Sequence, residues 1–219
     1  MKRIKVFDGV YLINNKLATE NIEIGRKVYG EDLIKDNNIE YRLWNPYRSK
    51  LAAAILNKLK TFEIKKNSLV LYIGSATGTT SSHVSDIVGE EGIVYCIEIS
   101  ERNMRQFLNS CENRENMVPI LADAGNPEQY KEMIDECDII YQDVSTRNQA
   151  EILLKNKEFL KKGGIVYFII KSQSIDISKN PNDVYEQELN KLKQDFEIIE
   201  QIDIEPYDKK HLFAVLKKY

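Results

Sequence analysis

A short apolar strand that runs into a turn with two glycines constrains the fold of this chain more than any other segment. Apolar residues 69–73 end at Gly74, Gly78 follows, and a helix is expected over 80–88. Glycine lets the backbone turn tightly and approach a ligand closely, and the first turn of the helix offers unpaired N–H groups. The segment therefore predicts a strand–turn–helix unit that cradles a nucleoside cofactor.

An acidic side chain follows each of the next three expected strands. The strands at 93–97, 117–121 and 138–141 lead to Glu98, Asp123 and Asp143. An acid at the tip of the second strand suits the hydroxyls of a ribose. The full set indicates S-adenosylmethionine, with one acid for ribose, one for adenine and one near the methionine end. A dinucleotide enzyme would more often carry a G-x-G-x-x-G run, whereas the turn here is G-x-x-x-G.

Strands and helices are expected to alternate from residue 49 onward. A helix over 50–59 comes first, and the later helices are expected over 101–112, 127–134, 147–160 and 183–193, between strands that end with 164–170 and 196–204. The last strand, 210–217, follows without a helix and should form an antiparallel pair at one edge. This pattern predicts an α/β, Rossmann-like fold with a mostly parallel sheet, and the polar loop at 171–182 lies where such folds carry their sites.

The first part of the chain reads differently. Short segments rich in β-formers occur at 4–7, 10–13, 16–19 and 27–29, with Asp8-Gly9 and Asn14-Asn15 as hairpin signals. We expect a small antiparallel β domain over residues 1–48 and a Rossmann-like domain over 49–219.

Composition excludes several classes of protein. No run of about 18 apolar residues predicts a membrane span, and the charged N-terminus lacks the apolar core of a secretory signal. The three cysteines show neither disulfide nor metal-site spacing. A net charge of −3 disfavours a stand-alone nucleic-acid binder but is compatible with an RNA enzyme whose partners hold the RNA. We expect a cytoplasmic protein without a metal.

Five segments together resemble the fibrillarin family, the methyltransferases of C/D box ribonucleoproteins. They are residues 40–55 with W-N-P-Y-R-S-K, residues 74–86 with G-S-A-T-G-T-T, and residues 141–144, 170–171 and 207–211. The resemblance covers essentially the whole chain. It is to the archaeal form, because the glycine- and arginine-rich extension of the eukaryotic form is missing.

The resemblance implies a class I S-adenosylmethionine-dependent methyltransferase with a mostly parallel seven-stranded sheet. It implies methyl transfer to ribose 2′-hydroxyls of rRNA, and of tRNA as a further substrate, directed by a C/D box guide RNA. A Nop-domain scaffold and a kink-turn-binding, ribosomal-protein-like subunit would be the protein partners. The implied catalytic tetrad is Lys50, Asp143, Lys171 and His211. The implied cofactor contacts are Gly74, Ala76, Gly78, Thr79, Thr80, Glu98, Ile99, Asp123, Ala124, Asp143 and Val144.

A 2′-hydroxyl is a weak nucleophile, so a positioned base must remove its proton as the methyl group arrives. Lys50 and Lys171, if close, would lower each other's pKa, while Asp143 would oppose that shift. A neutral Lys171 is then one candidate base, and His211 is the next.

Two further residues are interpreted as structural. His83 is interpreted as packing or capping, and Trp44 as a clamp between the two domains, with stacking on unpaired bases as its alternative.

The chain departs from the family at Ser145-Thr146-Arg147, typically Ala-Gln-Pro, and at Ser172-Gln173-Ser174, typically Ala-Arg-Ser. Two rival functions remain: a stand-alone methyltransferase for another substrate, and an inactive assembly subunit.

Overall fold

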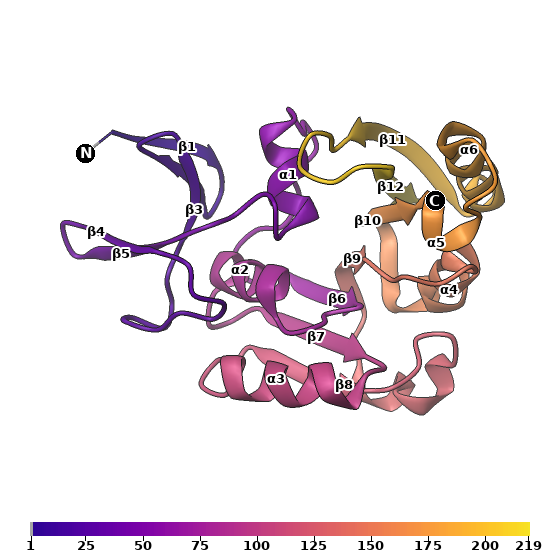
Figure 1. Ribbon diagram of the computed structural model, residues 1–219. Helices are drawn as coiled ribbons and strands as arrows, with labels where there is room; N and C mark the ends of the chain where they lie inside the picture. Colours follow the sequence, from indigo (N-terminus) through magenta and orange to yellow (C-terminus); the bar gives the residue numbers. More distant parts are fainter. Residues whose placement is uncertain (1) are drawn as a thin grey trace.

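The computed structural model describes residues 2–219 and arranges their strands in two sheets (Figure 1). The N-terminal sheet is five-stranded and antiparallel, with the order β1-β2-β3-β5-β4. Its strands are β1 (Arg3–Phe7), β2 (Val10–Ile13), β3 (Lys16–Glu20), β4 (Leu33–Asp36) and β5 (Ile39–Leu43).

The main sheet is seven-stranded, with the order β11-β12-β10-β9-β6-β7-β8. Its strands are β6 (Leu69–Ile73), β7 (Ile93–Glu98), β8 (Met117–Leu121), β9 (Cys137–Gln142), β10 (Leu160–Lys171), β11 (Phe196–Asp203) and β12 (His211–Lys218). Five neighbouring strands, β10, β9, β6, β7 and β8, are parallel to one another, and β12 runs antiparallel to both β10 and β11. Buried apolar runs in β6, β9 and β10 reflect strands covered on both faces. The predicted fold class and the antiparallel final pair are confirmed.

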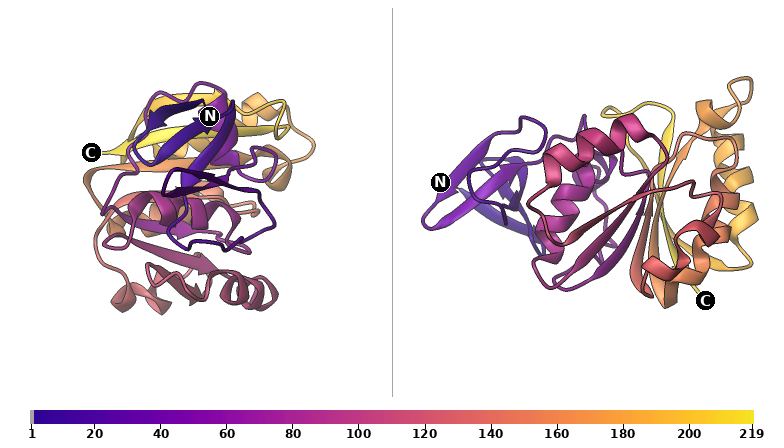
Figure 2. Two further views of the ribbon diagram at one scale, coloured as in Figure 1. Left: turned by 90° about the vertical axis from the view of Figure 1, so that its left-hand side faces the viewer. Right: turned by 90° about the horizontal axis from the view of Figure 1, so that it is seen from below.

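Helices cover both faces of the main sheet (Figures 1 and 2). On the face toward the N-terminal sheet lie α1 (Lys50–Leu56), α2 (Thr79–Val88) and α3 (Glu101–Cys111), which contribute Leu51, Val84 and Phe107 to one core cluster. On the opposite face lie α4 (Gln149–Asn156) and α6 (Pro181–Leu192), whose Leu153 and Leu189 belong to a second cluster. The short α5 (Ser172–Ile175) follows β10 directly.

Three predicted elements differ in the structure. The helix expected over 127–134 is two 3₁₀ turns, Pro127–Gln129 and Lys131–Met133. The helix expected over 147–160 ends at Asn156, and after a 3₁₀ turn Leu160 already pairs with Cys137 as the start of β10. The loop expected over 171–182 contains α5 and the start of α6.

Residues 27–29 do not form the expected strand. The Glu31 carboxylate accepts hydrogen bonds from the backbone N–H groups of Val28 and Tyr29, at 3.0 and 2.8 Å. These donors therefore bond to a side chain instead of a neighbouring strand. The remaining strands of the sheet are β4 and β5, which the sequence patterns did not single out.

Buried charges fasten the N-terminal sheet to the main domain. Arg42 of β5 is fully buried and lies 2.6 Å from a Glu31 oxygen and 2.9 Å from a carboxylate oxygen of Asp86 in α2. Arg114 contacts the other Asp86 oxygen at 2.7 Å. Removing one partner from such a cluster leaves an uncompensated charge away from water. The network therefore ties the two sheets into one folding unit.

Trp44 and His83 pack beside this network. Their rings stack at a centroid separation of 4.7 Å, and Trp44 is only 2% exposed. His83 is fully buried and hydrogen-bonds to Thr19 and Tyr29 through its two ring nitrogens. The interpretations of His83 as a packing residue and of Trp44 as a clamp are confirmed, and Trp44 has no open face for a base.

We propose a domain boundary between residues 48 and 49. In support, β5 ends at Leu43 and α1 begins at Lys50. The buried network around Arg42 indicates that the two domains fold together in spite of this boundary.

Replacing Arg42 with alanine should lower the free energy of unfolding by about 3–5 kcal/mol, because Asp86 and Glu31 would lose a buried partner. Urea denaturation followed by circular dichroism measures this change. The matched control is Arg105→Ala, since Arg105 is 79% exposed in its pair with Glu101 and should change stability by less than about 0.5 kcal/mol. A loss below about 1 kcal/mol for Arg42→Ala would contradict the structural role of the network.

Candidate active site

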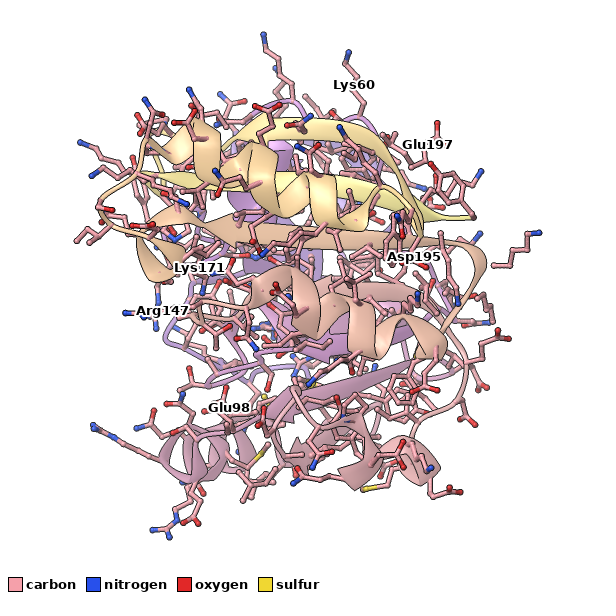
Figure 3. The ribbon with its side chains drawn as sticks, turned by 90° about the vertical axis from the view of Figure 1, so that its right-hand side faces the viewer. Lys60, Glu98, Arg147, Lys171, Asp195 and Glu197 are labelled. Atoms are coloured by element: carbon pink, nitrogen blue, oxygen red, sulfur yellow. The ribbon has the colours of Figure 1, made fainter. Side chains whose placement is uncertain are left out.

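The carboxyl ends of the central parallel strands open into a cavity of about 540 Å³. In Figure 3, Glu98, Arg147 and Lys171 lie at this end of the sheet, and Asp195 and Glu197 lie at the opposite end. All of the predicted cofactor positions except Gly78 line the cavity. The residues predicted from the strand ends are far apart in the sequence, and the fold brings them together around one cavity, as expected for an open α/β sheet.

The two glycines of the turn have different tasks. Gly74 has φ +85°, and a Cβ atom there would lie 2.6 Å from the backbone oxygen of Asp143. Gly78 has φ +92°, and its Cβ would lie 2.8 Å from the sulfur of Cys111 in α3. Gly74 therefore lets β6 and the end of β9 approach below the cavity, while Gly78 lets α3 pack against the turn.

Glu98 holds the glycine turn in shape. Its carboxylate accepts hydrogen bonds from the backbone N–H groups of Ala76 and Ser100, at 2.9 and 2.8 Å. Ala76 has a positive φ of 48°, so the carboxylate supports a backbone conformation that alanine seldom adopts. Glu98 is thus a structural support of the turn as well as a lining residue.

Ser75 provides an independent sign of a polar ligand. Its hydroxyl is buried and has no hydrogen-bond partner within residues 2–219, and the residue lines the cavity. Buried polar groups are normally satisfied, so an orphaned hydroxyl beside a cavity suits a ligand with polar groups.

Asp143 joins two lysines in the lining of the cavity. One carboxylate oxygen lies 3.0 Å from Lys50 Nζ and the other lies 2.6 Å from Lys171 Nζ. Lys171 also donates to the backbone oxygen of Asp143 at 3.3 Å and to Ser145 Oγ at 2.9 Å. The three charged side chains come from the first residue of α1, the residue after β9 and the last residue of β10.

The carboxylate decides the electrostatics of this cluster. Burial lowers the pKa of Lys50, but the carboxylates of Asp143 and Asp208 outweigh burial and raise that pKa above its usual value. Burial raises the pKa of Asp143, but the two ammonium groups outweigh it and hold that pKa below its usual value. The sequence left the balance between the two lysines and Asp143 open, and for Lys50 the carboxylates outweigh burial because one of them lies between the two ammonium groups.

His211, the fourth tetrad residue, does not line the cavity but lies beside the cluster. It opens β12 directly opposite Lys171 in the antiparallel register. Its Nδ1 lies 2.8 Å from the backbone oxygen of Lys209 and 3.0 Å from a carboxylate oxygen of Asp208. Burial lowers the pKa of His211 below its usual value, although Asp208 opposes that shift, so the ring is neutral at pH 7.

Sequence reasoning missed several lining residues. They are Arg48, Tyr72, Ser75, Ile97, Ser100, Asn103, Ala122, Ser145, Thr146 and Ile152. Arg48 lies inside the W-N-P-Y-R-S-K segment, and Ser145 and Thr146 are among the departures from the family pattern. Their closeness to these segments in the sequence was the signal that could have identified them.

Within the described residues, no cluster of three or more His, Cys, Asp or Glu side chains is arranged around a common point for a metal ion. No helix within residues 2–219 has both the length and the apolar character that crossing a membrane requires.

The sheet topology and the cavity at the glycine turn define a class I S-adenosylmethionine-dependent methyltransferase fold. The profile of the Fibrillarin family matches residues 1–219. A fibrillarin-like rRNA/tRNA 2′-O-methyltransferase of Pyrococcus abyssi is 47% identical over 218 residues, which cover 97% of this chain and 96% of the relative. This chain belongs to the fibrillarin family.

Solved structures agree with this assignment. The Methanococcus jannaschii fibrillarin pre-rRNA processing protein has a TM-score of 0.95 at 44% identity, covering 99% of this chain and 97% of its own. Aeropyrum pernix fibrillarin with natively bound S-adenosyl-L-methionine has a TM-score of 0.89 at 38% identity and 99% coverage of both chains. A fibrillarin/Nop5p complex matches with a TM-score of 0.88 at 37% identity, covering 97% of this chain and 98% of that chain.

Replacing Gly74 with alanine should weaken S-adenosylhomocysteine binding by at least about tenfold, because the new Cβ pushes Asp143 and the turn apart. Titration calorimetry measures the affinity, and thermal unfolding checks that the variant is folded. Gly25→Ala is the matched control, since Gly25 has a similar φ of +82° but nothing within 4 Å of its Cβ position. Equal affinities for a folded Gly74→Ala variant and the wild type would remove the turn from the binding site.

Proposed function

We propose that this chain is the catalytic subunit of a C/D box ribonucleoprotein. It transfers a methyl group from S-adenosylmethionine to ribose 2′-hydroxyls of rRNA, and of tRNA, at positions chosen by a guide RNA. The observation that carries the proposal is the Lys50–Asp143–Lys171 cluster in the lining of the cavity. Membership of the fibrillarin family and the name of the Pyrococcus relative support the same reaction.

The residues around the cavity fit this cofactor. Glu98 suits the ribose hydroxyls, and Asp123 with Ala124 suits the adenine. Thr79, Thr80, Asp143 and Val144 lie toward the methionine end in this assignment. The orphaned Ser75 hydroxyl adds a polar contact that the turn leaves open. When bound, the cofactor supplies an electrophilic methyl group on a sulfonium sulfur.

The chain's own residues then position the target hydroxyl and stabilise the charge that develops on its oxygen. Asp143 fixes the ammonium groups of Lys50 and Lys171 at the cavity, where donors in a partly dry site act strongly on a developing oxyanion. Lys171 Nζ lies close to three acceptors: a carboxylate oxygen of Asp143, the backbone oxygen of Asp143 and Ser145 Oγ. This arrangement favours Lys171 as a charged donor over Lys171 as the base.

The partners follow from what the chain lacks. With a net charge of −3, it is poorly suited to hold RNA by itself. A Nop-domain scaffold would recruit it, as the fibrillarin/Nop5p complex suggests, and a kink-turn-binding subunit would anchor the guide RNA. Because its cofactor and RNA substrates are intracellular, we place the assembly in the cytoplasm. A stand-alone methyltransferase and an inactive subunit are the alternatives, and the assembled tetrad counts against the second.

The purified chain should methylate RNA poorly and without site choice, whereas the reconstituted particle should methylate one ribose. The assay contains this chain, its scaffold, the kink-turn-binding protein, a C/D guide and a complementary RNA, with methyl groups mapped by position. Efficient, site-selective methylation by the chain alone would favour the stand-alone enzyme. Absence of transfer in the complete particle would favour the inactive subunit.

Replacing Lys171 with alanine should lower the single-turnover rate by about 100-fold or more, because Asp143 and the target oxygen both lose a positioned cation. Cofactor affinity should stay near the wild-type value. Lys162→Ala is the matched control, since Lys162 is exposed at the opposite end of the same strand and should leave the rate unchanged. A Lys171→Ala variant with a near-normal rate would remove Lys171 from the reaction.

A further inference from the structure

Asp208 contacts two members of the tetrad and lies outside it. One of its carboxylate oxygens is 3.0 Å from His211 Nδ1, and the other is 3.6 Å from Lys50 Nζ. Asp208 belongs to the loop between β11 and β12, whereas Lys50 opens α1 on the other side of the cluster. Its side chain therefore joins the last part of the chain to the helix that follows the N-terminal sheet.

The loop that carries Asp208 is held in place. The side-chain amide of Asn57, just after α1, donates to the backbone oxygens of Asp203 and Glu205, at 2.8 and 2.7 Å. The backbone N–H of Asp208 donates to Ile204 at 3.2 Å. At the far end of the loop, the backbone oxygen of Lys210 accepts a hydrogen bond from the Ser172 hydroxyl at 3.0 Å. Asp208 is thus placed by the same elements that place Lys50 and Lys171.

The contacts of His211 determine its tautomer. A carbonyl oxygen only accepts hydrogen bonds, so the 2.8 Å contact with the Lys209 oxygen requires a proton on Nδ1. The Asp208 carboxylate is an acceptor at the same nitrogen. Within residues 2–219, the hydrogen bonds of this ring are all made through Nδ1. In the neutral ring, Nε2 therefore carries the free lone pair.

We propose that Asp208 is a positioning residue that holds His211 with its proton on Nδ1, so that Nε2 takes the proton of the target 2′-hydroxyl. This inference rests on the proposed function. As the hydroxyl oxygen bonds to the methyl carbon, the carbon–sulfur bond breaks and its electron pair stays on sulfur. The hydroxyl proton moves to Nε2, and the resulting imidazolium is stabilised by the Asp208 carboxylate. A base oriented by a third group is a general arrangement in catalysis.

The surroundings of His211 suit an acceptor. The charged groups that act on it are Asp208 of its own loop, Lys50 of α1 and Asp143 after β9, and Lys171 of β10 lies opposite it in the strand register. The ring is neutral at pH 7, as its lowered pKa indicates. The two lysines, by contrast, are engaged as donors to Asp143. Among the three nitrogen bases of the tetrad, His211 is the one with a free lone pair.

Imidazole NMR of the free protein tests the arrangement independently of RNA. The chain has 2 histidines, and burial holds the pKa of His83 well below its usual value, so the ring signal that titrates at the higher pH belongs to His211. The wild type should show the Nδ1–H tautomer. Asp208→Asn should lower the titration midpoint by about 0.5–1 pH unit, because it removes the charge that favours imidazolium. Asp183→Asn, at an exposed position in α6, should leave the midpoint unchanged. An Nε2–H tautomer in the wild type, or an unchanged midpoint in Asp208→Asn, would overturn the inference.

Single-turnover rates in the reconstituted particle test the consequence for the reaction. Asp208→Asn should lower the rate about tenfold, keep S-adenosylhomocysteine affinity, and move the acidic limb of the pH–rate profile to lower pH. In a His211→Ala background, Asp208→Asn should cause no further loss, because two residues that act as a unit are not additive. Losses that multiply would instead show that Asp208 acts apart from His211 and would overturn the inference. A wild-type particle that transfers no methyl group would count against the proposed function, and the NMR result would still decide the geometry.

Discussion

The contact of one buried carboxylate with two ammonium groups is the constraint on which the site depends. Asp143, after the central strand β9, meets Lys50 from α1 and Lys171 from β10. Charges in such surroundings are costly unless they are paired, so α1, β9 and β10 have to meet in this register. The same residue limits the other side of the cavity, because its backbone oxygen leaves no room for a side chain at position 74. One residue thus sets the positions of both the lysines and the cofactor turn.

The N-terminal sheet contributes to the site although none of its strands lines the cavity. Arg42 and Trp44 fasten β5 to α2, and the chain then passes directly into α1, which begins with Lys50. Ser49 caps α1, and its hydroxyl accepts a hydrogen bond at 3.0 Å from Thr80 in the first turn of α2. The starts of the two helices are therefore linked beside the glycine turn. This explains physically why the W-N-P-Y-R-S-K segment forms one continuous motif: it is the connection that carries a catalytic candidate from the small sheet to the cavity.

Much of this was accessible from the sequence because local patterns and the geometry of parallel sheets determine it. Strand-end acids such as Glu98 and Asp143 meet at one edge whatever the details of packing. The order of the strands and the contacts between distant parts of the chain could not be predicted from the sequence. No pattern indicated that β12 would lie between β10 and β11, or that Glu31 would occupy the donors of Val28 and Tyr29. The pKa of Lys50 depends on its distances to two carboxylates, and sequence alone offers neither distance.

The two acids of the site differ in what surrounds them, and this separates their roles. Asp143 is enclosed, 15% exposed at its side chain, and each of its two oxygens lies at ion-pair distance from an ammonium group. Asp208 is 37% exposed and meets Nδ1 of a neutral ring, which leaves a lone pair on the opposite nitrogen. In the proposed mechanism, charge stabilisation falls to the lysines and proton acceptance to His211, so neither role requires a lysine to lose its proton inside an ion pair. Asp208, at 37% exposed, also leaves its side of the cluster more open to solvent than Asp143 does at 15%.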